Sequence, residues 1–329
     1  MGRFVNPDNG AFRKAVNSEI YVDKTGFLSY TNKVIDTKQA FICNSRPRRF
    51  GKSTTADMLA AYYSKGCNSE NLFTGLTVSD TADFRKYLNK YDVIHFDVQW
   101  FIADNEVAET VNTIQSNIVE ELRKEYPDIL DSSVVGLPDA MSIINERTGN
   151  RFVVIIDEWD VLIRDEARNQ DIQNAYIGFL RRMFKGIEPT KYVALAFLTG
   201  ILPIKKLKTQ SALNNFDEFT MLGSGNMAPY IGFTEEEVKT LAGKYHQNYD
   251  KVKKWYNGYL LNDYQTYNPQ AVVSVMLRGE FKSYWSETAS YEAVIPLLNM
   301  DIWHMIRCGD GHLFQMRKSA RNCQRQCVE

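Results

Sequence analysis

Short apolar runs alternate with longer segments of helical periodicity over the first two thirds of the chain. Short, mostly apolar runs predict strands at 39–44, 93–98, 151–157 and 192–198, and the continuous run after Arg151, with its β-branched residues, fits a strand buried on both faces. Amphipathic segments between them predict helices at 24–33, 52–64, 81–89, 106–125, 139–147 and 171–185. We expect segments 1–20 and 69–81 to be irregular. Strands that alternate with helices are typical of a parallel α/β sheet, whose right-handed crossovers bring the carboxyl ends of the strands to one edge.

The pattern changes after about residue 230, where shorter helical segments follow one another. Thr234 and Glu237 have the spacing of a capping box, which opens the first of the helices predicted at 234–245, 249–256 and 269–278. These helices predict a smaller, mostly helical module. Its many tyrosine and tryptophan side chains could stack on bases, but they fit the core of a small domain better. We therefore expect an α/β domain over 1–228 and a helical extension over 229–300.

The last segment, 301–329, does not continue either pattern. Its cysteines and histidines could suggest a metal site, but the spacing matches no zinc pattern; they are Cys308, Cys323, Cys327, His304 and His312. We expect an atypical tail, truncated or frame-shifted, and assign it no function.

Segment 45–54, which reads SRPRRFGKST, connects a predicted strand to a predicted helix. Backbone N–H groups of such a loop, together with the dipole of the following helix, favour a bound phosphate. In this arrangement Lys52 would reach the β- and γ-phosphates of a nucleoside triphosphate, and the Ser53 hydroxyl would ligate Mg²⁺. The residues expected to contact the nucleotide are Arg48, Arg49, Phe50, Gly51, Lys52, Ser53 and Thr54. The alternative is a basic turn before a helix, with Lys52 solvated.

A second candidate group of residues ends the apolar run at 151–157. Asp157 would hold Mg²⁺, directly or through water, and Glu158 would polarise the attacking water. Alternatively, Asp157 caps the next helix and Glu158 is solvated. The loop at 45–54 and the Asp157–Glu158 pair support each other, because one site for Mg²⁺ and nucleotide needs both.

A third candidate, Thr199, ends the strand predicted at 192–198. Its hydroxyl could bind the γ-phosphate or the attacking water as a sensor. Alternatively, it is a strand-end threonine that enters a glycine turn.

Three arginines surround the loop motif, and Arg46 stands where the first glycine of the usual pattern G-x-x-x-x-G-K-[ST] would be. One of Arg46, Arg48 and Arg49 could stabilise charge on the γ-phosphate as an arginine finger. Alternatively, they pair with carboxylates and hold the shape of the loop. Arg49 is the candidate for contact with phosphate or with a partner subunit.

Composition narrows the class of protein. The 39 Lys and Arg against 40 Asp and Glu give a net charge of −1, so binding of nucleic acid stays open but has no support from charge. No apolar run is long enough for a membrane span, and no signal-peptide pattern opens the chain. The five cysteines include no C-x-x-C pair, which argues against a zinc module. We expect a cytoplasmic protein without a membrane partner.

The ordered series of motifs resembles the bacterial AAA-ATPase-like proteins, a family of P-loop ATPases, over roughly residues 1–300. The motifs are YVDKT at 21–25, RPRRFGKS at 46–53, IIDE at 155–158, FLTGI at 197–201, YIGFTEEE at 230–237, WYNGY at 255–259 and YWSET at 284–288. The resemblance implies that Arg46 is normal at its position and that an extra strand lies between the lysine-bearing and the Asp-Glu-bearing strands. It also implies that ATP, rather than GTP, is the nucleotide. Family members commonly continue into a nuclease-like domain of the PD-(D/E)XK type, for which this chain is expected to be too short.

The sequence therefore predicts a P-loop NTPase fold of the α/β class with a mostly parallel sheet, followed by a smaller helical module. The predicted function is binding of ATP and Mg²⁺-dependent hydrolysis of ATP, with Glu158, Lys52 and Thr199 as catalytic residues and Ser53 and Asp157 as metal ligands. One alternative is an ATP-dependent switch or sensor with little turnover. Another is the ATPase part of a nucleic-acid-processing protein. A homo-oligomer or a protein partner is possible in each case.

Overall fold

The computed structural model describes residues 2–103, 109–165, 169–204 and 213–282, and the backbone of 306–307 and 313–314. The chain divides into two compact units, Met1–Phe233 and Thr234–Glu329. The predicted domain limits of 1–228, 229–300 and 301–329 stay a prediction. Most of the tail lies outside the described residues; within it, the strands β9 (Ile306–Arg307) and β10 (Leu313–Phe314) pair antiparallel.

A five-stranded parallel sheet forms the centre of the first unit, with the strand order β2-β3-β4-β1-β5. The strands are β1 (Phe41–Ser45), β2 (Asp92–Asp97), β3 (Phe152–Asp157), β4 (Val193–Gly200) and β5 (Asp217–Phe219). β4 lies between β1 and β3, which confirms the extra strand that the resemblance implied. The fold is therefore the α/β class with a parallel sheet that the apolar runs predicted. The edge strand β5 was not predicted, since it is only three residues long and partly exposed.

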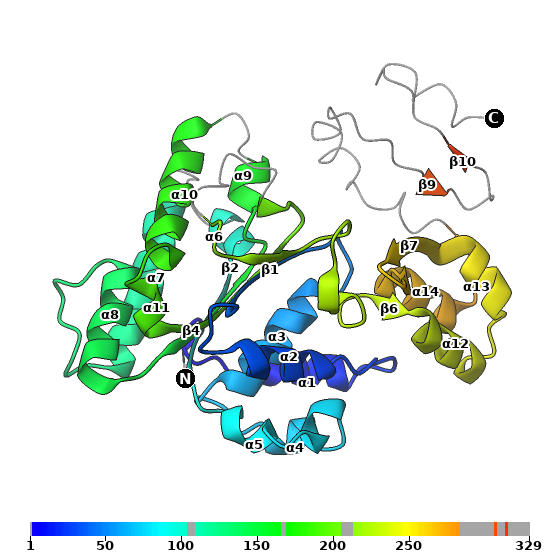
Figure 1. The fold of residues 1–329 in the computed structure, drawn as a ribbon, viewed down its shortest axis with the longest axis horizontal. Helices are drawn as coiled ribbons and strands as arrows, with labels where there is room; N and C mark the ends of the chain where they lie inside the picture. The colour runs from blue at the N-terminus through cyan, green and yellow to red at the C-terminus, as the bar shows by residue number, and fades with distance from the viewer. Residues whose placement is uncertain are drawn as a thin grey trace. The chain divides into compact units, whose positions relative to one another are not determined.

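Helices cover both faces of this sheet. In Figure 1, α1, α2 and α3 gather on one side and α7, α8, α10 and α11 on the other. The bounds on the first side are α1 (Gly10–Val16), α2 (Gly26–Val34) and α3 (Lys52–Tyr63). Those on the second side are α7 (Thr110–Glu125), α8 (Leu137–Thr148), α10 (Gln170–Phe184) and α11 (Pro189–Tyr192). The shorter helices are α4 (Glu70–Phe73), η1 (Thr77–Asp80), α5 (Phe84–Tyr87), α6 (Val98–Ala103), α9 (Val161–Asp165) and η5 (Gly225–Met227).

The prediction of irregular structure at 1–20 and 69–81 was wrong in part, because α1 and α4 form there. Both helices are too short to show a helical period, with seven and four residues. They are held by tertiary packing: the buried rings of Phe12 and Phe73 stack with their centroids 5.2 Å apart. The stability of these two helices therefore comes from a contact between distant segments. The hydrophobic periodicity of the sequence does not predict such a contact.

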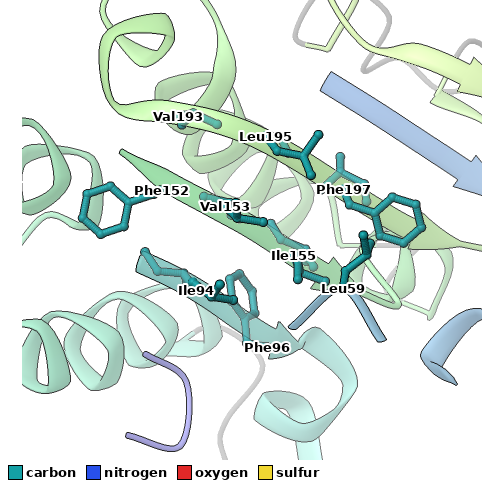
Figure 2. Close-up of a cluster of buried hydrophobic side chains, with 14 of the residues drawn as sticks. Leu59, Ile94, Phe96, Phe152, Val153, Ile155, Val193, Leu195 and Phe197 are labelled. Carbon is teal, nitrogen blue, oxygen red and sulfur yellow. The ribbon is translucent and has the colours of Figure 1, made fainter. Parts of the chain in front are cut away.

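Apolar side chains from the strands and α3 make one continuous core. Figure 2 shows Leu59 of α3 beside Ile155 of β3 and Phe197 of β4, and all three side chains are fully buried. β3 and β4 are buried at every position, because helices cover both faces. Full burial of such a side chain stabilises the fold by about 1.5–3 kcal/mol. This packing fixes α3, and with it the loop before α3, against the carboxyl edge of the sheet.

The described part of the second unit up to residue 282 contains three helices and a hairpin. Its elements are α12 (Glu235–Lys244), α13 (Tyr249–Tyr256), β7 (Asn257–Leu261), β8 (Tyr264–Tyr267) and α14 (Pro269–Arg278), after β6 (Phe233–Thr234). The capping box is confirmed, because Thr234 accepts the Glu237 N–H and Glu237 accepts the Thr234 N–H. The hairpin was not predicted; its tight turn places Asn262 at a φ of 51°.

Candidate functional site

Four parallel strands end at the same edge of the sheet and bring polar residues into one row. Asp97 of β2 is in register with Asp157 of β3, Asp157 with Thr199 of β4, and Thr199 with Asn44 of β1. The loop after β1 passes this row before α3 begins at Lys52. Loop and row come from distant parts of the sequence, and the sheet topology alone brings them together. This edge is where parallel α/β sheets bind ligands.

The backbone of the loop turns sharply where the motif requires it. Gly51, the residue before α3, has a φ of 86° and Arg49 a φ of 68°, both in the left-handed region. Glycine adopts this conformation at little cost, whereas arginine does so rarely. The α3 N–H groups therefore begin directly after the turn, as an anion site requires.

Lys52 extends from the first position of α3 toward the sheet edge, and its side chain is only 5% exposed. Its Nζ donates to the Pro47 carbonyl at 3.3 Å and lies 3.6 Å from the Glu158 Oε1. The lysine of the loop and the glutamate after β3 thus lie close together, as one site for Mg²⁺ and nucleotide would require. A bound polyphosphate would give the ammonium group a better partner than a backbone carbonyl.

Ser53 and Asp157 face each other across the gap between α3 and β3. The Ser53 hydroxyl donates to the Asp157 carboxylate, whose Oδ1 also accepts the Glu158 N–H at 2.9 Å. Burial raises the pKa of Asp157 to about 6, and the carboxylates of Asp97 and Glu158 act in the same direction. A divalent cation placed here would relieve this repulsion.

The oxygens of Ser53 and Asp157 suit a hard cation that is bound partly by the protein and partly by a nucleotide. Among the described residues, no group of three or more His, Cys, Asp or Glu side chains could hold a metal ion. Mg²⁺ needs no such group, since proteins commonly bind it through one or two carboxylates, waters and substrate phosphates. The Ser53 hydroxyl and the Asp157 carboxylate fit that kind of site.

Asp57 is a further carboxyl group beside this pair, and sequence reasoning missed it. It lies one helical turn after Ser53 in α3. Burial, followed by the charge of Asp157, raises the pKa of Asp57 to about 7. The spacing of four residues from the loop serine was the available signal.

Glu158 has a strained backbone and two cationic neighbours. Its φ of 46° is uncommon for a residue with a Cβ, and such strain concentrates at functional sites. Its side chain is 16% exposed, with Lys52 3.6 Å from Oε1 and Arg164 3.4 Å from Oε2. Glu158 is therefore close to the loop and still open to solvent, as a base for water must be.

The three arginines of the loop differ in position. The side chains of Arg48 and Arg49 are exposed, whereas Arg46 is fully buried and donates to the carbonyls of Ser45 and Phe219. Burial lowers the pKa of Arg46 to about 10. Arg46 thus ties the start of the loop to β5 through backbone carbonyls. Among the described residues no carboxylate forms an ion pair with Arg46, so the pairing with carboxylates that the sequence analysis offered is not seen for this arginine.

The other predicted site residues lie on the same edge of the sheet. Phe50 is buried beneath the loop and Thr54 is exposed on the first turn of α3. Thr199 is fully buried, and its hydroxyl donates to the Asn44 carbonyl at 3.3 Å. This hydrogen bond fits the alternative of a strand-end threonine. The sensor role of Thr199 stays a prediction.

Asp160 and Arg164 were not predicted, although they surround Glu158. Asp160 is fully buried, and its Oδ2 lies 3.4 Å from Arg164 Nη1. Their spacing of four residues, an acid followed by a base on one helical turn, was a signal in the sequence.

Comparison with known proteins identifies relatives of this chain. The model of the family described as "Predicted AAA-ATPase" matches residues 11–209. A protein of Azotobacter chroococcum mcd 1, described as an uncharacterized protein in vnfD 5'region, is 27% identical over 292 residues. The match covers 84% of this chain and 52% of that protein, so the chain spans about half the length of its relative.

Solved structures with a similar arrangement are more distant. C. elegans PCH-2 gives a TM-score of 0.34 at 11% identity, with 87% of this chain and 66% of that chain covered. The Aeropyrum pernix ORC2 protein gives 0.33 at 10% identity, with 70% and 55% covered. Drosophila ORC bound to AT-rich DNA and Cdc6 gives 0.30 at 12%, with 94% and 91% covered. These scores are too low to carry an argument about function.

No helix among the described residues is both long and apolar enough to cross a membrane.

Proposed function

The chain belongs to the predicted AAA-ATPase family, and on this premise we propose that it binds ATP and hydrolyses it with the help of Mg²⁺. The observation that carries the proposal is the meeting of Lys52 and Glu158 at the carboxyl edge of the sheet, 3.6 Å apart. A lysine on a glycine-containing loop and a carboxylate after a neighbouring strand are the two halves of a nucleotide-hydrolysing site.

Nucleotide binding would use the backbone of the loop and the first turn of α3. α3 begins directly after the turn at Gly51, so its first N–H groups would be available to a phosphate, whose negative charge the helix dipole favours. Lys52 would leave the Pro47 carbonyl for the β- and γ-phosphates. The residues we propose for contact with ATP are Arg48, Arg49, Phe50, Gly51, Lys52, Ser53 and Thr54.

Ser53 and Asp157 would hold Mg²⁺, because both offer oxygen ligands at the phosphate side of the sheet edge. The ion would supply neutralisation of charge on the phosphate oxygens. Asp157 must be ionised to bind it, which the raised pKa of about 6 allows at neutral pH.

Glu158 would accept a proton from the attacking water. Its carboxylate is partly exposed. Its φ of 46° takes the backbone out of the extended strand conformation directly after Asp157. Thr199, on the strand between β1 and β3, is our candidate for contact with the γ-phosphate or the water.

Phosphate release by the purified chain, with Mg²⁺ and ATP, tests the proposal. We expect steady turnover in the wild type that Glu158→Gln lowers by about 10²- to 10⁴-fold while ATP binding persists. Tight binding of ATP without turnover in the wild type would contradict hydrolysis and support a nucleotide-dependent switch instead. Salt-dependent retention of DNA would support the nucleic-acid-processing alternative, for which the net charge of −1 offers no argument.

A further inference from the structure

The two carboxylate oxygens of Glu158 have different partners. Oε1 lies 3.6 Å from the Lys52 Nζ, on the side of the loop, and Oε2 lies 3.4 Å from the Arg164 Nη1. Polyphosphate would draw Lys52 away from Oε1, because phosphate oxygens carry more charge and bind the ammonium group directly. That exchange would free Oε1 for a water while Oε2 kept its partner.

Arg164 cannot follow a ligand in this way, because its guanidinium is fixed from several sides. The side chain is 3% exposed, its Nε donates to the Asp165 Oδ1 at 2.9 Å, and its Nη1 lies 3.4 Å from the Asp160 Oδ2. A planar guanidinium held at more than one nitrogen keeps both its position and its orientation. It therefore offers Glu158 a fixed donor.

Asp160 connects this donor to the end of β4. The Asp160 Oδ2 accepts the backbone N–H groups of Ile201 at 3.1 Å and Leu202 at 2.7 Å. The Leu202 carbonyl in turn accepts the Ser45 hydroxyl at 2.9 Å, at the start of the loop. A hydrogen-bonded chain thus runs from Glu158 through Arg164 and Asp160 to the segment after β4.

The packing at Gly200 shows how closely that segment is held. A Cβ built on Gly200 would lie 2.4 Å from the Asp160 Oδ1, closer than real Cβ contacts come. Asp160 therefore packs directly against the backbone of β4, and this close approach needs a glycine at position 200.

We propose that Arg164 is a positioning residue for Glu158: it holds Oε2 so that Oε1 is presented to the water, and Asp160 sets its place from the end of β4. The inference rests on the proposed function and adds to it how the carboxylate is oriented. It differs from a purely structural ion pair in predicting a loss of turnover without a loss of nucleotide binding.

Steady-state ATP hydrolysis by Arg164→Ala and Arg164→Lys tests this inference. We expect kcat to fall by about 10- to 100-fold in Arg164→Ala, as is typical when a residue that orients a functional group is removed. Arg164→Lys should fall less, since it keeps the charge but loses the planar fork. The ATP dissociation constant from calorimetry should stay at the wild-type value in both. Arg182→Ala is the matched control, because Arg182 is an exposed arginine paired with Asp139.

A double-mutant cycle separates positioning from a general structural effect. If Arg164 acts through Glu158, adding Arg164→Ala to Glu158→Gln should lower the residual rate no further. Equal fold-losses in the wild-type and Glu158→Gln backgrounds would overturn the inference. If Arg164→Ala does not fold, the same cycle with Arg164→Lys decides the question. Thermal unfolding of each variant shows whether it is folded.

The outcomes distinguish this inference from the proposed function. Wild-type turnover that persists at full rate in Arg164→Ala, or that rises, would overturn the positioning role and leave the ATPase proposal standing. A wild type that binds ATP without turnover, or does not bind it, would overturn both.

Discussion

The ammonium group of Lys52 lies 3.6 Å from Oε1 of Glu158, although the two residues belong to different strand–helix units. Lys52 opens the helix after β1 and Glu158 follows β3, with β4 between the two strands. The parallel topology is what joins them, because strands that run in one direction present their carboxyl ends at one edge. This relationship carries the proposal of a nucleotide site.

Glu158→Gln separates binding from hydrolysis. The amide keeps the shape of the side chain but cannot accept a proton, so we expect turnover to fall by about 10²- to 10⁴-fold. ATP affinity should be retained or slightly increased, since one negative charge beside the phosphates is removed. Phosphate release and calorimetry on the same sample measure the two effects. Undiminished turnover in Glu158→Gln would exclude this residue as the base.

Asp157→Asn should weaken the Mg²⁺-dependent part of nucleotide binding. The amide is a poorer ligand for Mg²⁺ than a carboxylate, so a higher Mg²⁺ concentration should be needed for half-maximal ATP binding. Binding measured with EDTA should match the wild type. Asp139→Asn is the control, because Asp139 is more than half exposed and pairs with Arg182 rather than with Ser53. An identical Mg²⁺ dependence in wild type and Asp157→Asn would contradict the metal role.

Asp57 is expected to make stability depend on pH. Its folded pKa of about 7 lies above the ordinary pKa of an aspartate, 3.8, so the folded state binds the proton more tightly than the unfolded state. The contribution of Asp57 is therefore most favourable below about pH 4 and is lost as the pH rises toward 7. Asp57→Asn, which stays neutral, should exceed the wild type in stability at pH 7.5 by on the order of 4 kcal/mol.

Comparison of the wild type with Asp57→Asn at low pH provides the control. At pH 4.5 the wild-type carboxyl is mostly protonated in the folded state, so most of the advantage of Asp57→Asn should be lost. About a quarter of it should remain, because the unfolded carboxyl is still largely ionised at that pH. Urea unfolding at both pH values gives the difference. An advantage that is the same at pH 4.5 and 7.5 would show that the effect is not ionisation.

Leu59→Ala should destabilise the first unit through the core that supports α3. Leu59 is fully buried beside Ile155 and Phe197 (Figure 2), and loss of such a side chain costs about 2–5 kcal/mol. Val135→Ala is the control, because Val135 is 74% exposed and should change stability by less than about 0.5 kcal/mol. Urea unfolding measures both. Equal midpoints for the two variants would contradict the packing of α3 against the sheet.

The strands of the sheet and the loop before α3 could be predicted from the sequence, because each depends on residues close together in the chain. β1, β3 and β4 are buried at every position and β2 at all but His95 and Asp97, so their sequences are mostly apolar and end in polar residues at the edge of the sheet. The glycine before Lys52 marked the turn into α3. These features fix the strands and the loop before any tertiary contact is considered.

The parts that were missed depend on contacts between distant segments. The buried carboxylate of Asp160 is explained only by the backbone N–H groups of Ile201 and Leu202, which follow another strand. Likewise, α1 is held by the stacking of Phe12 on Phe73. Arg46 could be identified as a departure from the motif, but its hydrogen bond to the Phe219 carbonyl required the position of β5. The sequence pattern of a segment predicts its local structure. The contacts of Asp160, Phe12 and Arg46 are with residues far away in the sequence, so that pattern does not predict them.

Calorimetric titration of ATP in the presence of Mg²⁺, on the wild type and on Lys52→Ala, is the most direct test of a nucleotide site at this edge of the sheet. Thermal unfolding of the variant, compared with the wild type, establishes that it is folded. We expect saturable binding in the wild type and a loss of affinity of at least about tenfold in Lys52→Ala, because a charge-assisted contact with phosphate is removed. Equal ATP affinity in the two proteins would contradict the site.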